Sequence, residues 1–184
     1  MLFANGRYLS YSLLAIAKQR FNNIRNLLTN TKLSIQTRIR FVKCYIWPIL
    51  LYGCETWSIN KDLENRLRAT EMWLWRRTLK ISWTERKTNE EVLQTISLDR
   101  ELINSIRKRQ LNFMGHIIRE DKIEFTCLSG KIEGRRQRGR PRQKYIDRLL
   151  EITGGTQANL IRSARDRKGW RSIVANVQVD TAPR

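Results

Sequence analysis

The stretch LSYSLLAIAKQRFNNIRNLLT, residues 9–29, carries a clear helical pattern. Its apolar residues recur at spacings of three and four, which places their side chains on one face of an α-helix. Lys18, Arg20 and Arg25 fall outside that face. The apolar face consists of Leu13, Leu14, Ile16, Ala17, Phe21, Ile24, Leu27 and Leu28. The stretch therefore predicts an amphipathic helix whose apolar face is wide enough to need helical partners.

Helix-capping residues mark the starts of further helices along the first two thirds of the chain. Such a side chain accepts a hydrogen bond from a backbone N–H that the first helical turn leaves unpaired. Pro48 lacks a backbone N–H and predicts the end of one helix near Trp47. The expected helices start at Ser34, Asn60, Thr88 (with the capping box TNEE, residues 88–91) and about Asp99, and the last continues to about Arg119.

The final third of the sequence changes character twice. Residues 121–134 lose the helical period and contain glycines, which predicts a loop or a weak hairpin. Residues 135–144, RRQRGRPRQK, form a basic run of low complexity. Three short helical segments follow, and Thr156 and Asp166 are suited to cap the second and third of them.

These patterns predict a mostly α-helical protein in three parts. We expect a helical bundle over residues 1–120, a loop and basic linker over residues 121–144, and a small three-helix module over residues 145–184. The hydrophobic content of 41% in 184 residues is sufficient for a packed core.

The charge of the chain points to an anionic partner. The sequence has 36 Lys and Arg residues against 17 Asp and Glu residues, and its formal net charge is +19. Residues 1–60 hold 8 basic residues and one acidic residue, residues 61–120 hold 13 and 9, and residues 121–184 hold 15 and 7. Basic side chains in the two outer thirds therefore lack internal counter-charges. This excess favours nucleic acid as the partner, with an anionic membrane surface as the competitor.

Two basic clusters are the candidate contacts with nucleic acid. Arg38, Arg40 and Lys43 fall within about one turn of an expected helix. The basic run repels itself unless an anion lies against it, and its segment RGRP, residues 138–141, is similar to the core of an AT-hook. The alternative is an exposed linker whose Pro141 starts a helix. The candidate binding residues are Arg38, Arg40, Lys43, Arg135, Arg136, Arg138, Arg140, Arg142 and Lys144.

The sequence lacks the residue sets that most enzymes need. The single histidine, His116, excludes an HExxH metal site, and neither of the common glycine-rich phosphate-binding loops is present. Two-metal phosphoryl transfer needs converging carboxylates, whereas the acidic pairs here belong to a helix cap and a helix end. We therefore expect no catalytic residue, no cofactor and no small-molecule substrate.

The cysteines and tryptophans fit a helical core better than a binding site. Cys44, Cys54, Cys127 and His116 are the ligand types of a zinc site, but they lack a C-x₂₋₄-C pair, so we expect core cysteines and no metal. Four of the six tryptophans lie between residues 57 and 83 beside Leu and Met, which favours core packing over base stacking. Trp83 is the best candidate for exposure, because a turn follows it. Arg76 and Arg77 are interpreted as a solvated helix face rather than a binding site.

The cellular location of the protein can also be predicted. An odd number of cysteines and the absence of an N-x-[ST] sequon favour a reducing, intracellular location. The longest apolar run, residues 44–54, has 11 residues and is too short to cross a bilayer core of about 30 Å. We therefore expect no membrane partner.

Blocks of sequence spread over nearly the whole chain carry a family resemblance. The longest is RFVKCYIWPILLYGCETWSI, residues 40–59. The others are NNIRNLLTN (22–30), EMW (71–73), LKISWT (79–84), NEEVL (89–93), FMGHIIR (113–119), GKIEGRR (130–136) with RGRPR (138–142), and ARDR (164–167) with WR (170–171). In this order they resemble the region that follows the polymerase palm in non-LTR (LINE-type) retrotransposon endonuclease–reverse transcriptases.

The resemblance implies a thumb-like role for residues 1–120 and a partner that is element RNA, target DNA or both. The family's polymerase carboxylates and endonuclease residues match no position in this chain. We therefore expect a nuclear fragment of a transposable element, a truncated copy or a partial gene, without RNA-directed DNA polymerase activity of its own. The alternatives are a stand-alone DNA-binding protein that uses the RGRP segment, and a basic module that binds proteins or membrane surfaces.

Overall fold

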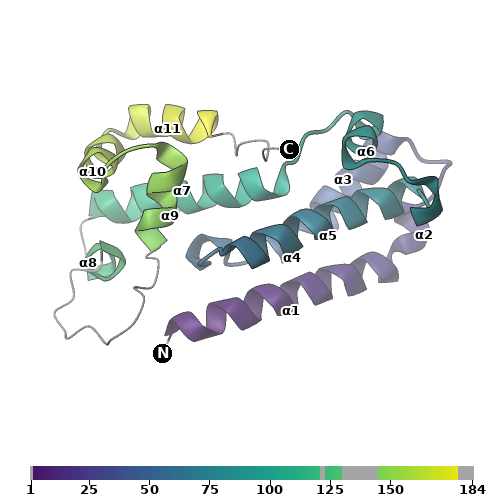
Figure 1. Cartoon of the computed structure of the whole chain (residues 1–184), viewed down its shortest axis with the longest axis horizontal. Coiled ribbons are helices and arrows are strands. Elements are labelled where there is room, and N and C mark those ends of the chain that lie inside the picture. The colour runs from purple at the N-terminus through teal and green to yellow at the C-terminus, as the bar shows by residue number, and fades with distance from the viewer. Residues whose placement is uncertain (1, 121–122, 130–144, 178–184) are drawn as a thin grey trace. The chain divides into compact units, whose positions relative to one another are not determined.

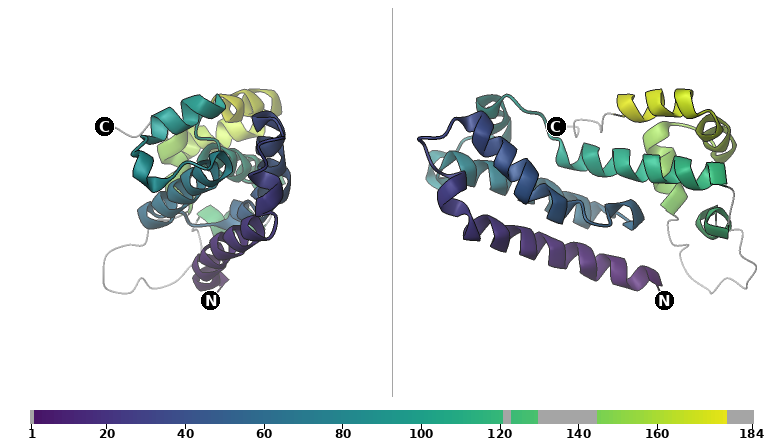
Figure 2. Two further views of the ribbon diagram at one scale, coloured as in Figure 1. Left: turned by 90° about the vertical axis from the view of Figure 1, so that its right-hand side faces the viewer. Right: turned by 180° about the vertical axis from the view of Figure 1, so that it is seen from behind.

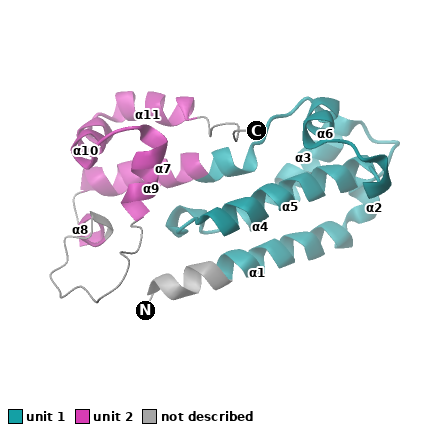
Figure 3. Ribbon diagram, in the orientation of Figure 1, with its two compact units in different colours: residues 1–106 teal, residues 107–184 magenta. Residues whose placement is uncertain are grey.

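The computed structural model describes residues 2–120, 123–129 and 145–177, and all regular structure within these ranges is helical (Figure 1). This confirms the predicted mostly α-helical fold. The chain divides into two compact units, residues 1–106 and 107–184 (Figure 3). None of the described helices combines the length and the apolar character needed to cross a membrane.

The first unit is a bundle in which α1 lies against α4 and α5, and α3 packs on α4 and α5 (Figures 1 and 2). Its core contains the fully buried side chains of Phe21, Trp57, Leu67 and Trp75. Its helices are α1 (Leu2–Asn23), α2 (Arg25–Leu28), α3 (Ile35–Tyr45), α4 (Trp47–Leu50), η1 (Cys54–Thr56), α5 (Lys61–Leu79), η2 (Trp83–Glu85), α6 (Asn89–Ile96) and the start of α7 (Leu102–Glu120).

The apolar face predicted over residues 9–29 is confirmed for most of its members. Leu13, Leu14, Ala17, Phe21 and Leu28 are buried, whereas Ile16 and Leu27 are exposed. The stretch forms two helices instead of one, because the backbone leaves the helical conformation at Ile24 (φ −110°, ψ 19°).

The predicted caps of the first unit are present. The Ser34 hydroxyl accepts a hydrogen bond from the Thr37 backbone N–H (3.2 Å), and Asn60 Oδ1 accepts one from the Leu63 N–H (2.8 Å). Thr88 forms the predicted capping box, because its hydroxyl accepts from the Glu91 N–H while Glu91 accepts from the Thr88 N–H. Each cap pairs N–H groups that a helix start leaves without an internal partner.

A carboxylate from α5 binds the start of helix α7. Glu71 is 1% exposed, and its Oε1 accepts hydrogen bonds from the backbone N–H groups of Glu101 and Leu102, each at 2.9 Å. Burial raises the pKa of Glu71, and the two N–H groups oppose that rise. This side chain therefore fastens the first turn of α7 to the middle of α5.

The second unit consists of the rest of α7 and four shorter helices. These are α8 (Ile123–Ser129), α9 (Tyr145–Thr153), α10 (Gln157–Arg165) and α11 (Arg167–Asn176). Leu111, Met114 and Ile118 of α7 share one core with the C-terminal helices, so α7 is part of both units. The prediction of a loop or weak hairpin over residues 121–134 is wrong for residues 123–129, which form α8.

The three helices expected in the C-terminal part of the chain are present as α9, α10 and α11. Thr156 caps α10 by accepting from the Asn159 N–H (3.3 Å), and Asp166 caps α11 by accepting from the N–H groups of Lys168 and Gly169. Pro141, expected to start the first of these helices, lies outside the described residues.

Trp170 of α11 joins the module to α7 within this unit. Its indole Nε1 donates to the Leu111 carbonyl at 3.1 Å, and its ring lies against the backbone of Gly115. A methyl group at Gly115 would lie 2.7 Å from the indole Cδ1, inside contact distance. Only glycine therefore admits the indole to this part of α7.

The hydrogen bonds from Glu71 to the start of α7 form a clamp between α5 and α7. We predict that E71Q tests the ionisation of this side chain, whereas E71A tests its hydrogen bonds. The raised pKa of Glu71 means that the folded state binds the proton more tightly than the unfolded state, whose pKa is near 4.5. The contribution of this carboxyl to stability therefore falls as the pH rises above about 4.5 and through the folded pKa. In urea unfolding between pH 5 and pH 8, E71Q should remove this decline.

E71A, in contrast, should lose about 1–3 kcal/mol at every pH for each N–H left unpaired. Equal pH profiles for the wild type and E71Q would contradict this account of Glu71.

We also predict that G115A destabilises the second unit. Alanine favours a helix over glycine by about 1 kcal/mol, but the overlap with Trp170 should outweigh that gain and cost about 1–3 kcal/mol net. The matched control is N112A on the exposed face of the same helix. In urea unfolding, a G115A protein that is more stable than N112A would contradict the close packing of the indole on α7.

Candidate nucleic-acid interface

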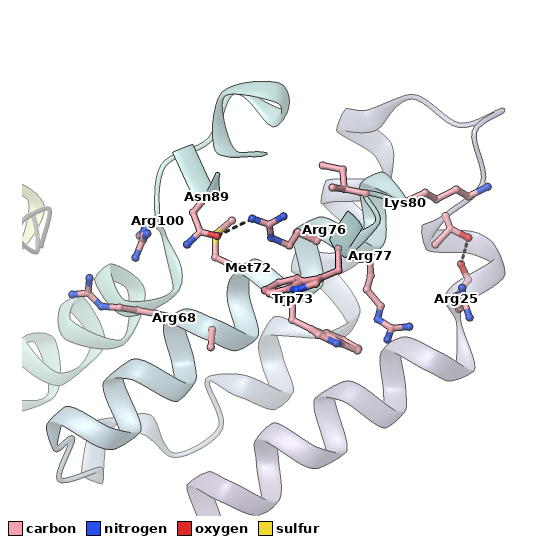
Figure 4. A pocket seen from close by; sticks show the side chains of 13 residues that line it. Arg25, Arg68, Met72, Trp73, Arg76, Arg77, Lys80, Asn89 and Arg100 are labelled. Atoms are coloured by element: carbon pink, nitrogen blue, oxygen red, sulfur yellow. Dashed lines mark hydrogen bonds between the residues drawn. The ribbon is translucent and has the colours of Figure 1, made fainter. Parts of the chain in front are cut away.

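A pocket with a volume of about 790 Å³ opens on the surface of the first unit (Figure 4). Side chains from α2, α5, η2 and α6 meet there. Of the described residues that line the pocket, six are basic, two are tryptophan and none is acidic. The lining residues are Arg25, Thr29, Arg68, Ala69, Met72, Trp73, Arg76, Arg77, Lys80, Ile81, Trp83, Asn89 and Arg100.

The C-terminal end of α5 gives the pocket its shape. Arg76 and Arg77 lie in the last turn, where positive charge interacts favourably with the helix dipole. The helix ends at Leu79. Lys80 follows in the left-handed conformation (φ 60°), and the Ile81 N–H then donates back to the Arg76 carbonyl at 2.9 Å. This tight reversal returns the chain toward α5 and brings Trp83 to the pocket.

Aromatic rings orient two of the arginines. The guanidinium carbon of Arg77 lies 4.8 Å from the ring centroid of Trp73, and that of Arg76 lies 5.7 Å from the centroid of Trp83. Arg76 also donates to the Lys87 carbonyl (2.7 Å) and to Asn89 Oδ1 (3.2 Å), and Figure 4 shows Arg76 turned toward Asn89. Cation–π contact and hydrogen bonds thus hold these charges in fixed directions.

The basic residues of the pocket differ in whether they are already paired. Arg68 forms an ion pair with Glu64 at 2.6 Å. Arg25, Arg77 and Lys80 are exposed and have no carboxylate within ion-pair distance among the described residues. These three charges remain available for an external anion.

The exposed Trp83 is held by a short, well-capped turn. The Ser82 N–H donates to Glu85 Oε1 at 2.8 Å, and Lys87 pairs with the same carboxylate at 3.0 Å. The Ser82 N–H, and next to it Lys87, lower the pKa of Glu85, so this carboxylate is charged at neutral pH. The indole itself is 85% exposed, which confirms the prediction for Trp83.

Of the helical candidates, two have partners within the fold. Arg38 is half-buried and donates to the Thr78 carbonyl at 2.8 Å. Lys43 pairs with Glu101 and lies 5.5 Å from the ring centroid of Trp47. Arg40 is exposed, and none of the three lines the pocket. Arg135, Arg136, Arg138, Arg140, Arg142 and Lys144 lie outside the described residues.

Sequence reasoning did not single out Arg25, Lys80 or Arg100, and it favoured a solvated face for Arg76 and Arg77. A signal was present in WLWRRTLKISW, residues 73–83, where three basic residues lie between tryptophans without an acidic residue. Such interleaving of aromatic and basic side chains is typical of surfaces that bind single strands.

The cysteine and tryptophan predictions have mixed outcomes. Trp47, Trp57, Trp75 and Trp170 are buried as core residues, and so is Cys54. The prediction of core cysteines is wrong for Cys44 and Cys127, because both side chains are exposed. Within the described ranges, no group of three or more potential metal ligands occurs.

Comparison with known proteins gives one informative relationship. The chain is 30% identical over 166 residues to a Caenorhabditis elegans protein whose name describes it as uncharacterized and transposon-derived. The alignment covers 84% of this chain and 59% of the relative, so the chain spans little more than half of the relative's length. No protein-family model matches the sequence, and no solved structure matches it. The similarity fits an origin of this chain in a transposable element.

Proposed function

We propose that this chain is a nucleic-acid-holding segment of a LINE-type reverse transcriptase, and that the basic pocket of its first unit contacts the phosphate backbone. The observation that carries the proposal is the set of three exposed, unpaired charges, Arg25, Arg77 and Lys80, around a pocket without acidic lining residues. Positive charge without a counter-charge in a pocket attracts a polyanion. The three side chains lie around the end of α5, where they can contact the phosphates of a flexible nucleic-acid strand.

Two further observations support a retrotransposon origin. The relative in Caenorhabditis elegans is named as transposon-derived. The resemblance to the region behind the reverse transcriptase palm includes the block LKISWT, residues 79–84, which contributes Lys80, Ile81 and Trp83 to the pocket. On this proposal the first unit holds element RNA or target DNA, and the residues 135–144 provide a second basic contact.

The charge-based part of the proposal predicts a specific loss of salt dependence. Each phosphate neutralised on a single strand contributes about 0.7 to the slope of log affinity against log salt. The triple variant R25Q/R77Q/K80Q should therefore bind a labelled single-stranded oligonucleotide more weakly, with a slope reduced by about 2. Fluorescence anisotropy over a range of salt concentrations measures both quantities.

A control of equal charge makes this test selective. R20Q/K32Q/K61Q removes three exposed basic residues that do not line the pocket. If both triple variants lose the same affinity and slope, the chain binds through its net charge and the pocket has no special role. Tight binding of an acidic peptide, unaffected by competing oligonucleotide, would instead indicate a protein partner.

The basic run can be separated from the pocket in the same assay. Replacing Arg135, Arg136, Arg138, Arg140 and Arg142 by alanine removes the AT-hook-like segment. If this variant alone loses affinity, and loses it mainly for A·T-rich duplex, the stand-alone DNA-binding function is the better interpretation.

We further propose that the chain does not polymerise DNA by itself, because none of its residues matches the family's polymerase carboxylates. Primer extension on an RNA template should give no product with the purified chain. Primer extension above the level seen with a mock purification from cells that do not express the chain would refute this part of the proposal.

A further inference from the structure

Trp83 has an unusual position for a large apolar side chain. It is 85% exposed, more than Tyr52 (66%) and Tyr45 (46%), which are the other exposed aromatic residues among the side chains that the structure describes. An indole left in water forgoes the stabilisation that burial would give. Single exposed apolar residues are common, so exposure alone indicates nothing. The surroundings of Trp83 distinguish it.

The turn that carries the indole is held at both ends. Before it, the reversal at Lys80 joins it to α5 through the Ile81 N–H and the Arg76 carbonyl. Within it, Ser82 and Glu85 form a capping box, and Glu85 pairs with Lys87. A short segment with this many local bonds loses little conformational entropy when a ligand binds.

One side of the indole already has a partner. The Arg76 guanidinium lies over the ring at 5.7 Å and is fixed by its bonds to Lys87 and Asn89. A cation on one face of an aromatic ring leaves the opposite face for another planar group. The exposed fraction of 85% shows that most of the side chain is open to solvent.

We propose that Trp83 is a stacking platform for an unpaired nucleobase, next to the charges that hold the backbone. The inference rests on the proposed function, because the exposed charges Arg25, Arg77 and Lys80 supply the backbone contacts that bring a base to the ring. Base stacking on aromatic residues tolerates every base, because each has a π-face. The site therefore selects single-stranded over double-stranded nucleic acid without selecting a sequence.

Duplex nucleic acid cannot use this platform in the same way. Within a duplex, each base is stacked on both faces and presents only its edges in the grooves. The ring of Trp83 is then left in water, while the basic side chains still contact phosphates. A strand without bases has the same limitation, although its charge is that of an ordinary single strand.

The test compares three probes with equal labels and the full-length chain. They are a short single-stranded DNA, a strand of the same length with tetrahydrofuran in place of every nucleoside, and a dumbbell duplex whose two ends are closed by linkers without nucleobases. The wild type should bind the base-bearing strand more tightly than the other two. W83A should lose about 5- to 100-fold in affinity for that strand and little for the others.

Two further variants complete the design. W83F should retain part of the preference, because phenylalanine keeps a smaller stacking surface. Y52A removes an exposed aromatic side chain that does not line the pocket and should leave all three affinities unchanged. Because Trp83 is exposed, its substitution should leave the unfolding midpoint nearly unchanged, and thermal unfolding checks this.

The outcomes separate the two proposals. If the wild type binds all three probes equally with a steep salt dependence, backbone binding is supported and the stacking platform is refuted. If W83A weakens every probe by the same factor, Trp83 acts through the structure of the pocket and stacking is again refuted. If no probe binds, both proposals fail.

Discussion

The buried hydrogen bonds of Glu71 join α5, the central helix of the first unit, to the start of α7. Glu71 lies in the middle of α5 and accepts the N–H groups of Glu101 and Leu102, which begin α7. Arg100, a lining residue of the pocket, directly precedes this clamp. Burying a carboxylate is costly, and here backbone N–H groups that need partners offset part of that cost. The clamp therefore pairs the N–H groups of a helix start, while burial still raises the pKa of the carboxyl, and it fixes the backbone next to Arg100.

The basic residues of the first unit consequently fall into two groups. Arg38 and Lys43 serve the fold: one donates to the Thr78 carbonyl near the end of α5, and the other pairs with Glu101 beside the clamp. Exposed arginines at the pocket have no such partner among the described residues, and the best placed of them, Arg77, is oriented by Trp73. A basic side chain that is paired within the fold is not available to bind a ligand. Arg25, Arg77 and Lys80 have no carboxylate partner among the described residues, while Glu71 and Arg38 make contacts that hold α5 in place.

The sequence was sufficient to predict features that depend on neighbouring residues. The caps at Ser34, Asn60, Thr88, Thr156 and Asp166 are all present, because a cap and the N–H that it binds lie within three residues of each other. The pocket could not be predicted in this way. It requires α2 to approach the end of α5 and a left-handed residue at Lys80, where glycine is the usual signal. The hydrogen bond of Arg38 could not be predicted either, because its partner lies forty positions away on another helix. Helix α8 has only seven residues, and the glycines that follow at positions 130 and 134 favoured a loop instead.

Charge and aromatic surface have separate consequences for what the pocket can distinguish. Unpaired arginine and lysine side chains attract any polyanion, and salt weakens that attraction whatever the ligand. An indole held open beside them adds an interaction that salt screens far less and that only an accessible base can make. For a protein that holds a strand during copying, the first property gives affinity and the second restricts it to nucleic acid whose bases are unpaired. The short capped turn at Trp83 matters for both, because it keeps the ring and the charge of Arg76 in one fixed geometry before the strand arrives.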